Sequence, residues 1–249
     1  MRYFAELSYR GTAYHGWQVQ PKDVSVQEII EKALSTLLRT DISITGAGRT
    51  DAGVHARQMY AHFDLETPPD LSDLVYRLNA FLPADIAIHE IYRVHDEAHA
   101  RFDAVSRSYE YHIISRKDPF AIDQAWYHRQ ETDVKKMNQA AALLLQYEDF
   151  ECFSRSKTDV KTYICKVSRA EWEVTGNRLV FHISADRFLR NMVRAVVGTL
   201  MEIGTGRMEV SELHRIIESR DRREAGASVP AHGLYLTKVE YPKTIFQHS

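Results

Sequence analysis

Apolar and polar residues alternate along several stretches of the chain, as they do in strands that bury one face. In the first of these, residues 2–9, Tyr3, Ala5, Leu7 and Tyr9 share one face. Further strands are predicted for residues 85–94, 106–115 and 234–241, and a hairpin for residues 163–174 and 178–184.

Helical spacing of apolar residues appears between these strands. The run Ser25-Val26-Gln27-Glu28 is typical of a capping box, and it opens a helix with an apolar face. Four more helices are expected at residues 71–81, 132–146, 188–203 and 210–219. Because helices and hairpins are mixed, the sequence predicts an α+β fold with a mainly antiparallel sheet. The turn region around residues 95–105 favours two halves, residues 1–104 and 105–249.

Composition narrows the class of protein. The 249 residues are 44% hydrophobic and 27% charged, which is typical of a globular protein, and no apolar run is long enough to span a bilayer. The first six residues alternate like a strand rather than a signal peptide. Cys152 and Cys165 form neither a disulfide framework nor a metal cluster, so we expect a cytoplasmic protein. Since the net charge is only −2, nucleic-acid binding would require basic residues gathered on one face.

Residues 46–56 form the densest cluster of unusual residues, with three glycines, Arg49, Asp51 and His55. Short alternating patterns precede and follow this stretch, so it is predicted to be a loop between two strands. Glycines allow the close approach of another backbone, which would fix a carboxylate such as that of Asp51. The same residues also suit an ordinary turn or cap.

Arg194 lies within an apolar run, residues 192–203, that predicts a buried helix. A buried guanidinium keeps its charge and therefore needs a partner. That partner is either Glu202, or another structural acid, or Asp51. Arg187 and Arg190 precede Arg194 at a spacing that would put all three on one side of the helix, as a solvated basic face or as a track for phosphates.

Aromatic residues mark two further stretches. Tyr109 and Tyr111 lie on one face of the strand at residues 106–115, either as core residues or in a site. Residues 9–20 combine glycines with Tyr14 and Trp17, which would form either exposed stacking surfaces or a small cluster packed under a loop.

The run Gly-Arg-Thr-Asp-Ala-Gly-Val-His-Ala at residues 48–56 resembles the signature loop of the TruA-type tRNA pseudouridine synthases. Residues 9–20, 99–111, 149–153, 188–194 and 225–234 also resemble segments of that family, so the resemblance covers residues 9–242. It implies two α+β halves joined through one long sheet, with the active-site cleft between them.

The resemblance also implies roles for four residues. Asp51 would be the catalytic nucleophile, and Tyr109 would stack on the target uracil. Arg49 would contact the RNA or fill the space left by an extruded nucleotide. Arg194 would pair with Asp51 and keep its carboxylate ionised and in position.

The reaction implied is the conversion of uridine to pseudouridine at positions 38, 39 and 40 in the anticodon arm of tRNA, by a homodimer. It requires no metal and no cofactor. Two other classes of protein remain open: an RNA-binding module that has lost catalysis, and an Asp-dependent nucleoside hydrolase. The hydrolase would release free uracil, whereas a pseudouridine synthase leaves the base attached.

Overall fold

The computed structural model describes residues 1–155 and 161–246. The chain forms two units. The first is Met1–Val105 together with Tyr235–Ser249, and the second is Ser106–Leu234. The sequence predicts a division after residue 104; in the structure the C-terminal segment groups with the first unit.

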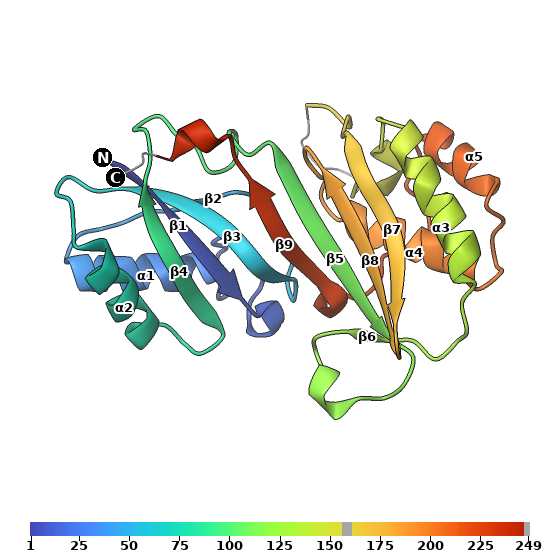
Figure 1. Cartoon of the computed structure of the whole chain (residues 1–249), viewed down its shortest axis with the longest axis horizontal. Coiled ribbons are helices and arrows are strands. Elements are labelled where there is room, and N and C mark those ends of the chain that lie inside the picture. Colours follow the sequence, from blue (N-terminus) through green and yellow to red (C-terminus); the bar gives the residue numbers. More distant parts are fainter. Residues whose placement is uncertain (156–160, 247–249) are drawn as a thin grey trace. The chain divides into compact units, whose positions relative to one another are not determined.

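The first unit is built on a sheet whose strands are confirmed close to their predicted positions (Figure 1). The strands are β1 (Arg2–Tyr9), β2 (Thr45–Gly46), β3 (His55–Asp64), β4 (Ile86–Arg93) and β9 (Leu234–Glu240). β1 pairs antiparallel with β3 and β4, and β2 pairs antiparallel with β3. β9 pairs with β3 in parallel, at His55 and Ala56. The strand expected before the signature loop is therefore only two residues long.

Two helices pack with this sheet, α1 (Val26–Leu38) and α2 (Leu71–Phe81). The side chain of Ser25 accepts a hydrogen bond from the backbone N–H of Glu28, as the predicted capping box requires. Asp70 caps α2 in the same way. Buried residues of α1, such as Ile30 and Leu34, supply the apolar face expected from the sequence.

The second unit combines a sheet with three helices. Its strands are β5 (Ser106–Ile114), β6 (Trp126–Tyr127), β7 (Val167–Thr175) and β8 (Arg178–Ala185). The order is β5-β8-β7 with antiparallel pairing, and β6 adds to β5 in parallel. The helices are α3 (Val134–Leu143), α4 (Met192–Gly204) and α5 (Glu212–Ser219). Together the two units confirm the α+β class with mainly antiparallel sheets.

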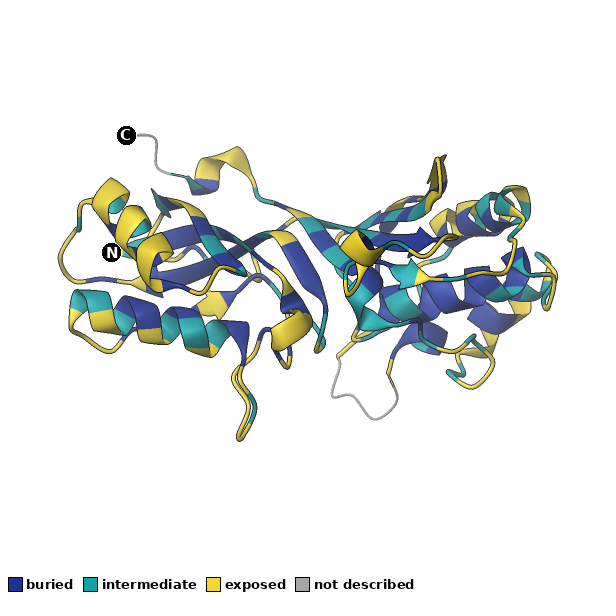
Figure 2. Cartoon of the chain, turned by 90° about the horizontal axis from the view of Figure 1, so that it is seen from below, coloured by how far each residue is buried: buried dark blue, intermediate teal, exposed yellow. Residues whose placement is uncertain are grey.

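Helix α4 forms the core of the second unit. Eleven of its residues are buried, and the buried positions run all round the helix, as its composition predicts (Figure 2). Arg194 and Glu202 are the two half-buried positions. Exposed residues lie instead at the loops and on the outer sides of the other helices.

The predicted start of α4 at residue 188 is wrong. Asn191 adopts a left-handed conformation with φ of 66°, which breaks the helical path, and the helix begins at Met192. Asparagine adopts this conformation more readily than most other L residues. Here Asn191 Nδ2 donates a hydrogen bond to Ser228 Oγ at 2.6 Å.

Within the part of the chain that the structure describes, no helix has both the length and the apolar surface needed to cross a bilayer.

Candidate active site

The loop that carries Asp51 joins the short strand β2 to the start of β3. Asp51 is half-buried and Arg49 is exposed. Gly53 has a φ of 79°, which L side chains rarely adopt, and the N–H of Val54 donates to the carbonyl of Asp51 at 3.2 Å. The loop therefore turns tightly directly after the carboxylate.

A second segment, residues 9–17, holds this loop through hydrogen bonds. The N–H of Trp17 donates to the carbonyl of Thr50 at 3.3 Å, and the N–H of Gly53 donates to the carbonyl of Tyr14 at 3.3 Å. The hydroxyls of Tyr9 and Thr50 lie 2.9 Å apart. These contacts fix the loop on both sides of Asp51.

Two glycines allow the backbones of the two segments to touch. A Cβ atom on Gly11 would lie 2.0 Å from the carbonyl oxygen of Val54. A Cβ atom on Gly16 would lie 2.3 Å from the carbonyl oxygen of Thr50. Neither position therefore has room for a side chain.

The aromatic residues of this segment are buried rather than exposed. Tyr14 is 7% exposed and Trp17 is 2% exposed, so the interpretation as an exposed stacking surface is wrong and the packed cluster is the correct alternative. The hydroxyl of Tyr14 donates to Asp85 Oδ1 at 2.6 Å. Burial, together with the carboxylate of Asp85, raises the pKa of Tyr14. The segment supports the loop and offers no stacking surface of its own.

An exposed aromatic ring does occur elsewhere in the first unit, in the turn at residues 99–103. Phe102 is 73% exposed, and its ring centroid lies 4.2 Å from that of His99. The turn is braced by Asp103, whose carboxylate accepts the N–H of His99 at 2.7 Å. The sequence predicts no separate role for Phe102, because the exposure of a side chain cannot be predicted in a segment without periodic structure.

Tyr109 and Tyr111 have different environments although they share a face of β5. Tyr111 is fully buried and donates its hydroxyl to the carbonyl of Pro230 at 2.8 Å, so the core interpretation is correct for it. Tyr109 is half-buried, and its ring packs edge-on against Phe188, with centroids 5.1 Å apart at 87°. Phe188 thus orients the ring of Tyr109.

Arg194 has a backbone partner within the second unit. Its Nε donates to the carbonyl of Val229 at 2.8 Å, and the N–H of Val229 donates to the carbonyl of Arg194 at 3.2 Å. Glu202, one of the acids considered as its partner, is engaged by Arg207. Arg194 is half-buried rather than fully buried, so its environment is less apolar than the sequence suggests.

The segment at residues 225–229 lies directly on α4. A Cβ atom on Gly198 would lie 1.8 Å from the carbonyl oxygen of Ala227. The N–H of Gly226 donates to the hydroxyl of Thr199 at 2.8 Å. This contact explains the small residues in the segment and brings the carbonyl of Val229 to the guanidinium of Arg194.

The arrangement predicted for Arg187 and Arg190 is wrong, because both lie before the start of α4. The guanidinium of Arg187 donates to the carbonyl of Thr162 at 3.2 Å. Arg190 is exposed. The two residues do not form a helical face with Arg194.

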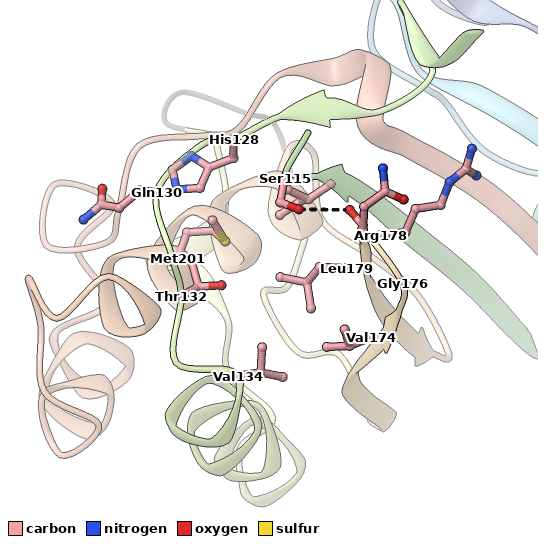
Figure 3. A pocket seen from close by; sticks show the side chains of 12 residues that line it. Ser115, His128, Gln130, Thr132, Val134, Val174, Gly176, Arg178, Leu179 and Met201 are labelled. Carbon is pink, nitrogen blue, oxygen red and sulfur yellow. Dashed lines mark hydrogen bonds between the residues drawn. The ribbon is translucent and has the colours of Figure 1, made fainter. Parts of the chain in front are cut away.

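A cavity of about 140 Å³ lies in the second unit, between the β7–β8 hairpin, β5, α3 and α4 (Figure 3). His128, Thr132 and Arg178 are among its lining residues, and a hydrogen bond joins Ser115 to the backbone of Asn177 at its edge. None of the four predicted site residues lines it. The cavity is therefore separate from the candidate site.

The two cysteines are structural. Cys152 and Cys165 are both fully buried, and burial raises the pKa of each thiol to about 12. Among the described residues, no three His, Cys, Asp or Glu side chains are grouped so that they could hold a metal ion.

Comparisons with known proteins identify the family of the chain. A family model described as tRNA pseudouridine synthase matches residues 5–103 and 140–242. The chain is 51% identical, over 248 residues, to tRNA pseudouridine synthase A of Bacteroides fragilis, covering 99% of this chain and 98% of that protein. The protein of the same name from Porphyromonas gingivalis is 50% identical, over 98% and 99% of the two chains. The one from Chlorobaculum tepidum is 41% identical, over 95% and 96%. This chain therefore belongs to the tRNA pseudouridine synthase family, as an isomerase that converts uridine to pseudouridine in tRNA.

Proposed function

We propose that the protein modifies uridines 38, 39 and 40 in the anticodon stem-loop of tRNA, with Asp51 as the nucleophile. The proposal extends the family's reaction to a specific region of the substrate and a specific residue. The role of Asp51 is supported by the loop, in which backbone hydrogen bonds and glycine contacts hold the residues on both sides of Asp51. A nucleophile held in this way needs no rearrangement before it attacks. The three positions rest on the family resemblance.

The reaction breaks one bond to the ribose and forms another. The bond between C1′ and N1 breaks, the base turns, and a bond forms between C1′ and C5. C5 loses its proton and N1 gains one, so the product is an isomer and no oxidant or reductant is consumed. Asp51 would form a transient covalent bond, either to the ribose or to C6 of the base, which is then released.

Three other residues would serve this step. The ring of Tyr109, oriented by Phe188, would stack on the uracil, and its hydroxyl could exchange a proton during the rearrangement. Arg194, oriented by the carbonyl of Val229, would pair with the Asp51 carboxylate and keep it ionised. Arg49, exposed in the loop, would contact the opened RNA.

The test uses purified protein and an unmodified tRNA transcript, without added metal or cofactor. Carbodiimide labelling followed by primer extension maps each pseudouridine as a stop. We expect stops at positions 38 to 40 with the wild type and none with Asp51→Ala. Asp41→Ala removes an exposed carboxylate ten residues earlier and serves as the matched control, which should keep full activity.

Each other outcome identifies an alternative. Stops elsewhere in the tRNA would contradict the assignment of positions, and activity in Asp51→Ala would contradict the nucleophile. Release of free uracil would indicate a nucleoside hydrolase. Binding of tRNA without stops on any uridine-containing RNA would favour a module that has lost catalysis.

A further inference from the structure

His55 is a buried polar residue that the proposed reaction does not use. It is 1% exposed and is the first residue of β3, four positions after Asp51. Burial of an imidazole is costly unless its nitrogens are hydrogen-bonded. The contacts of its ring therefore indicate what it does.

One ring nitrogen of His55 accepts a hydrogen bond from the backbone. The N–H of Gly11 donates to Nδ1 at 3.0 Å, and both groups are buried. Because Nδ1 accepts, it carries no hydrogen, and the proton of the neutral ring is on Nε2. The ring also stacks on Tyr235 of β9, with centroids 4.6 Å apart at 28°. The stacking thus sets the orientation of the His55 ring, and the hydrogen bond sets its tautomer.

Gly11 begins the short 3₁₀ turn Gly11–Ala13, which lies within the segment, residues 9–17, that holds the Asp51 loop. Directly after the turn, Tyr14 accepts the N–H of Gly53. At Gly11 itself, the backbone is so close to Val54 that no Cβ fits. A shift of the turn would therefore move the loop on the C-terminal side of Asp51.

We propose that His55 is a positioning residue for Asp51: its Nδ1 anchors the Gly11 turn, and the turn holds the loop in its reactive position. The inference rests on the proposed role of Asp51 as nucleophile. Without the acceptor, the buried N–H of Gly11 has no hydrogen-bond partner, and a backbone shift that restores one displaces the carboxylate. A displacement of about 1 Å can reduce a rate by roughly 100-fold.

The test compares three substitutions at residue 55. In His55→Asn, the side-chain oxygen occupies nearly the position of Nδ1 and can accept from Gly11. In His55→Gln, the oxygen lies near the position of Nε2 instead, and His55→Leu has no acceptor. All three variants lose the stacking on Tyr235, so that loss is common to them. Asn and Gln differ in which ring nitrogen their oxygen replaces, so comparing them tests the acceptor at the Nδ1 position.

The first readout is the single-turnover rate at saturating tRNA, measured together with the Kd for tRNA and the urea midpoint. We expect Gln and Leu to lower the rate by about 10- to 100-fold with less than a threefold change in Kd. Asn should remain within about fivefold of the wild type. Equal rates for Asn and Gln, or losses that follow the urea midpoints, would overturn the proposal.

The second readout does not depend on activity. Amide hydrogen exchange of Gly11, followed by NMR, should be slow in the wild type and in His55→Asn and faster in His55→Gln and His55→Leu. If Gly11 exchanges equally in all four proteins, the anchor does not exist. If the exchange pattern is as expected but the wild type makes no pseudouridine, the proposed function fails while the anchor stands.

Discussion

At the scale of single residues, the candidate site depends on backbone atoms as much as on side chains. Carbonyl groups of Tyr14 and Val229 hold the loop of Asp51 and the guanidinium of Arg194, respectively. Such partners are invisible to a motif search, because any residue can supply a carbonyl. Their positions depend on small neighbours, which explains why glycines occur at Gly11, Gly16 and Gly198.

Tyr109 provides a test of base stacking. Tyr109→Phe keeps the ring and its contact with Phe188, whereas Tyr109→Ala removes both. Since stacking on a base contributes about 1–3 kcal/mol, Ala should weaken tRNA binding or lower the single-turnover rate by about 5- to 150-fold. Phe should retain binding and lose only the contribution of the hydroxyl to the rate. Equal effects of the two substitutions on binding would contradict the stacking role.

His62 makes stability depend on pH. It is 7% exposed, and its Nδ1 accepts the N–H of Ala100 at 3.1 Å. Burial, then the positive charge of Arg2 and the neighbouring His99, lower the pKa of His62 from 6.5 to about 4. Between about pH 4 and 6.5, His62 is therefore protonated in the unfolded chain but neutral in the folded protein.

Stability contributed by neutral His62 is complete above pH 6.5, and it falls as the pH is lowered towards about 4. By pH 5 the loss should be on the order of 2 kcal/mol, since one pKa unit corresponds to about 1.4 kcal/mol and pH 5 lies about 1.5 units below the ordinary pKa of histidine. Urea unfolding at pH 7, 6 and 5 measures it. His62→Asn keeps an acceptor for Ala100 but does not titrate, so its slope over this range should be smaller. Identical slopes for the two proteins would contradict the assignment.

At the scale of elements, α4 and the segment at residues 225–229 pack directly on each other. Gly198→Ala would raise helix propensity, but its Cβ would lie 1.8 Å from the Ala227 carbonyl oxygen. The steric overlap should outweigh the gain in helix propensity and lower the free energy of unfolding by about 2 kcal/mol. Gly48→Ala is the control, because a Cβ there meets nothing within 4 Å. An unchanged urea midpoint for Gly198→Ala would show that the segment does not pack on α4 as described.

The elements that sequence predicts well are those governed by local chemistry. The β7–β8 hairpin turns at Gly176 with a φ of 63°, as a glycine turn should, and Ser25 caps α1. Prediction failed where a distant contact decides. Asn191 adopts a left-handed conformation, so α4 begins only at Met192. Its side-chain amide donates a hydrogen bond to Ser228, 37 residues away. The ring of Trp17 is buried against Gly46, where a Cβ would lie 2.5 Å from it, so its burial could not be judged locally.

The same distinction applies to the site. Asp51 and Arg49 were selected by the family resemblance of residues 48–56, since glycines and a carboxylate in one loop also suit an ordinary turn; their roles stay predictions. His55 lies in the same motif, but its role depends on Gly11, 44 residues earlier, and on Tyr235. No local pattern connects these three residues. Similarly, a basic residue in an apolar helix drew attention to Arg194, while its contact with Val229 required the structure.

At the scale of the whole molecule, the chain has little net charge for a protein that binds tRNA, since the formal value is −2. A symmetric dimer would offer a larger surface on which basic residues can gather. We therefore expect light scattering to give a mass near twice the 28.8 kDa of the chain at working concentrations. A mass near that of one chain, unchanged by adding tRNA, would contradict the dimer.

The central claim, that the Asp51 carboxylate carries the reaction, has one direct measurement. In tRNA labelled with tritium at C5 of uridine, each pseudouridine formed releases one tritium to water, because C5 loses its hydrogen. Single-turnover release should fall by at least about 10⁴-fold in Asp51→Asn, which keeps the shape of the side chain and removes its nucleophilic charge. Binding of tRNA should change little. Release by Asp51→Asn within tenfold of the wild type would show that another group performs the attack.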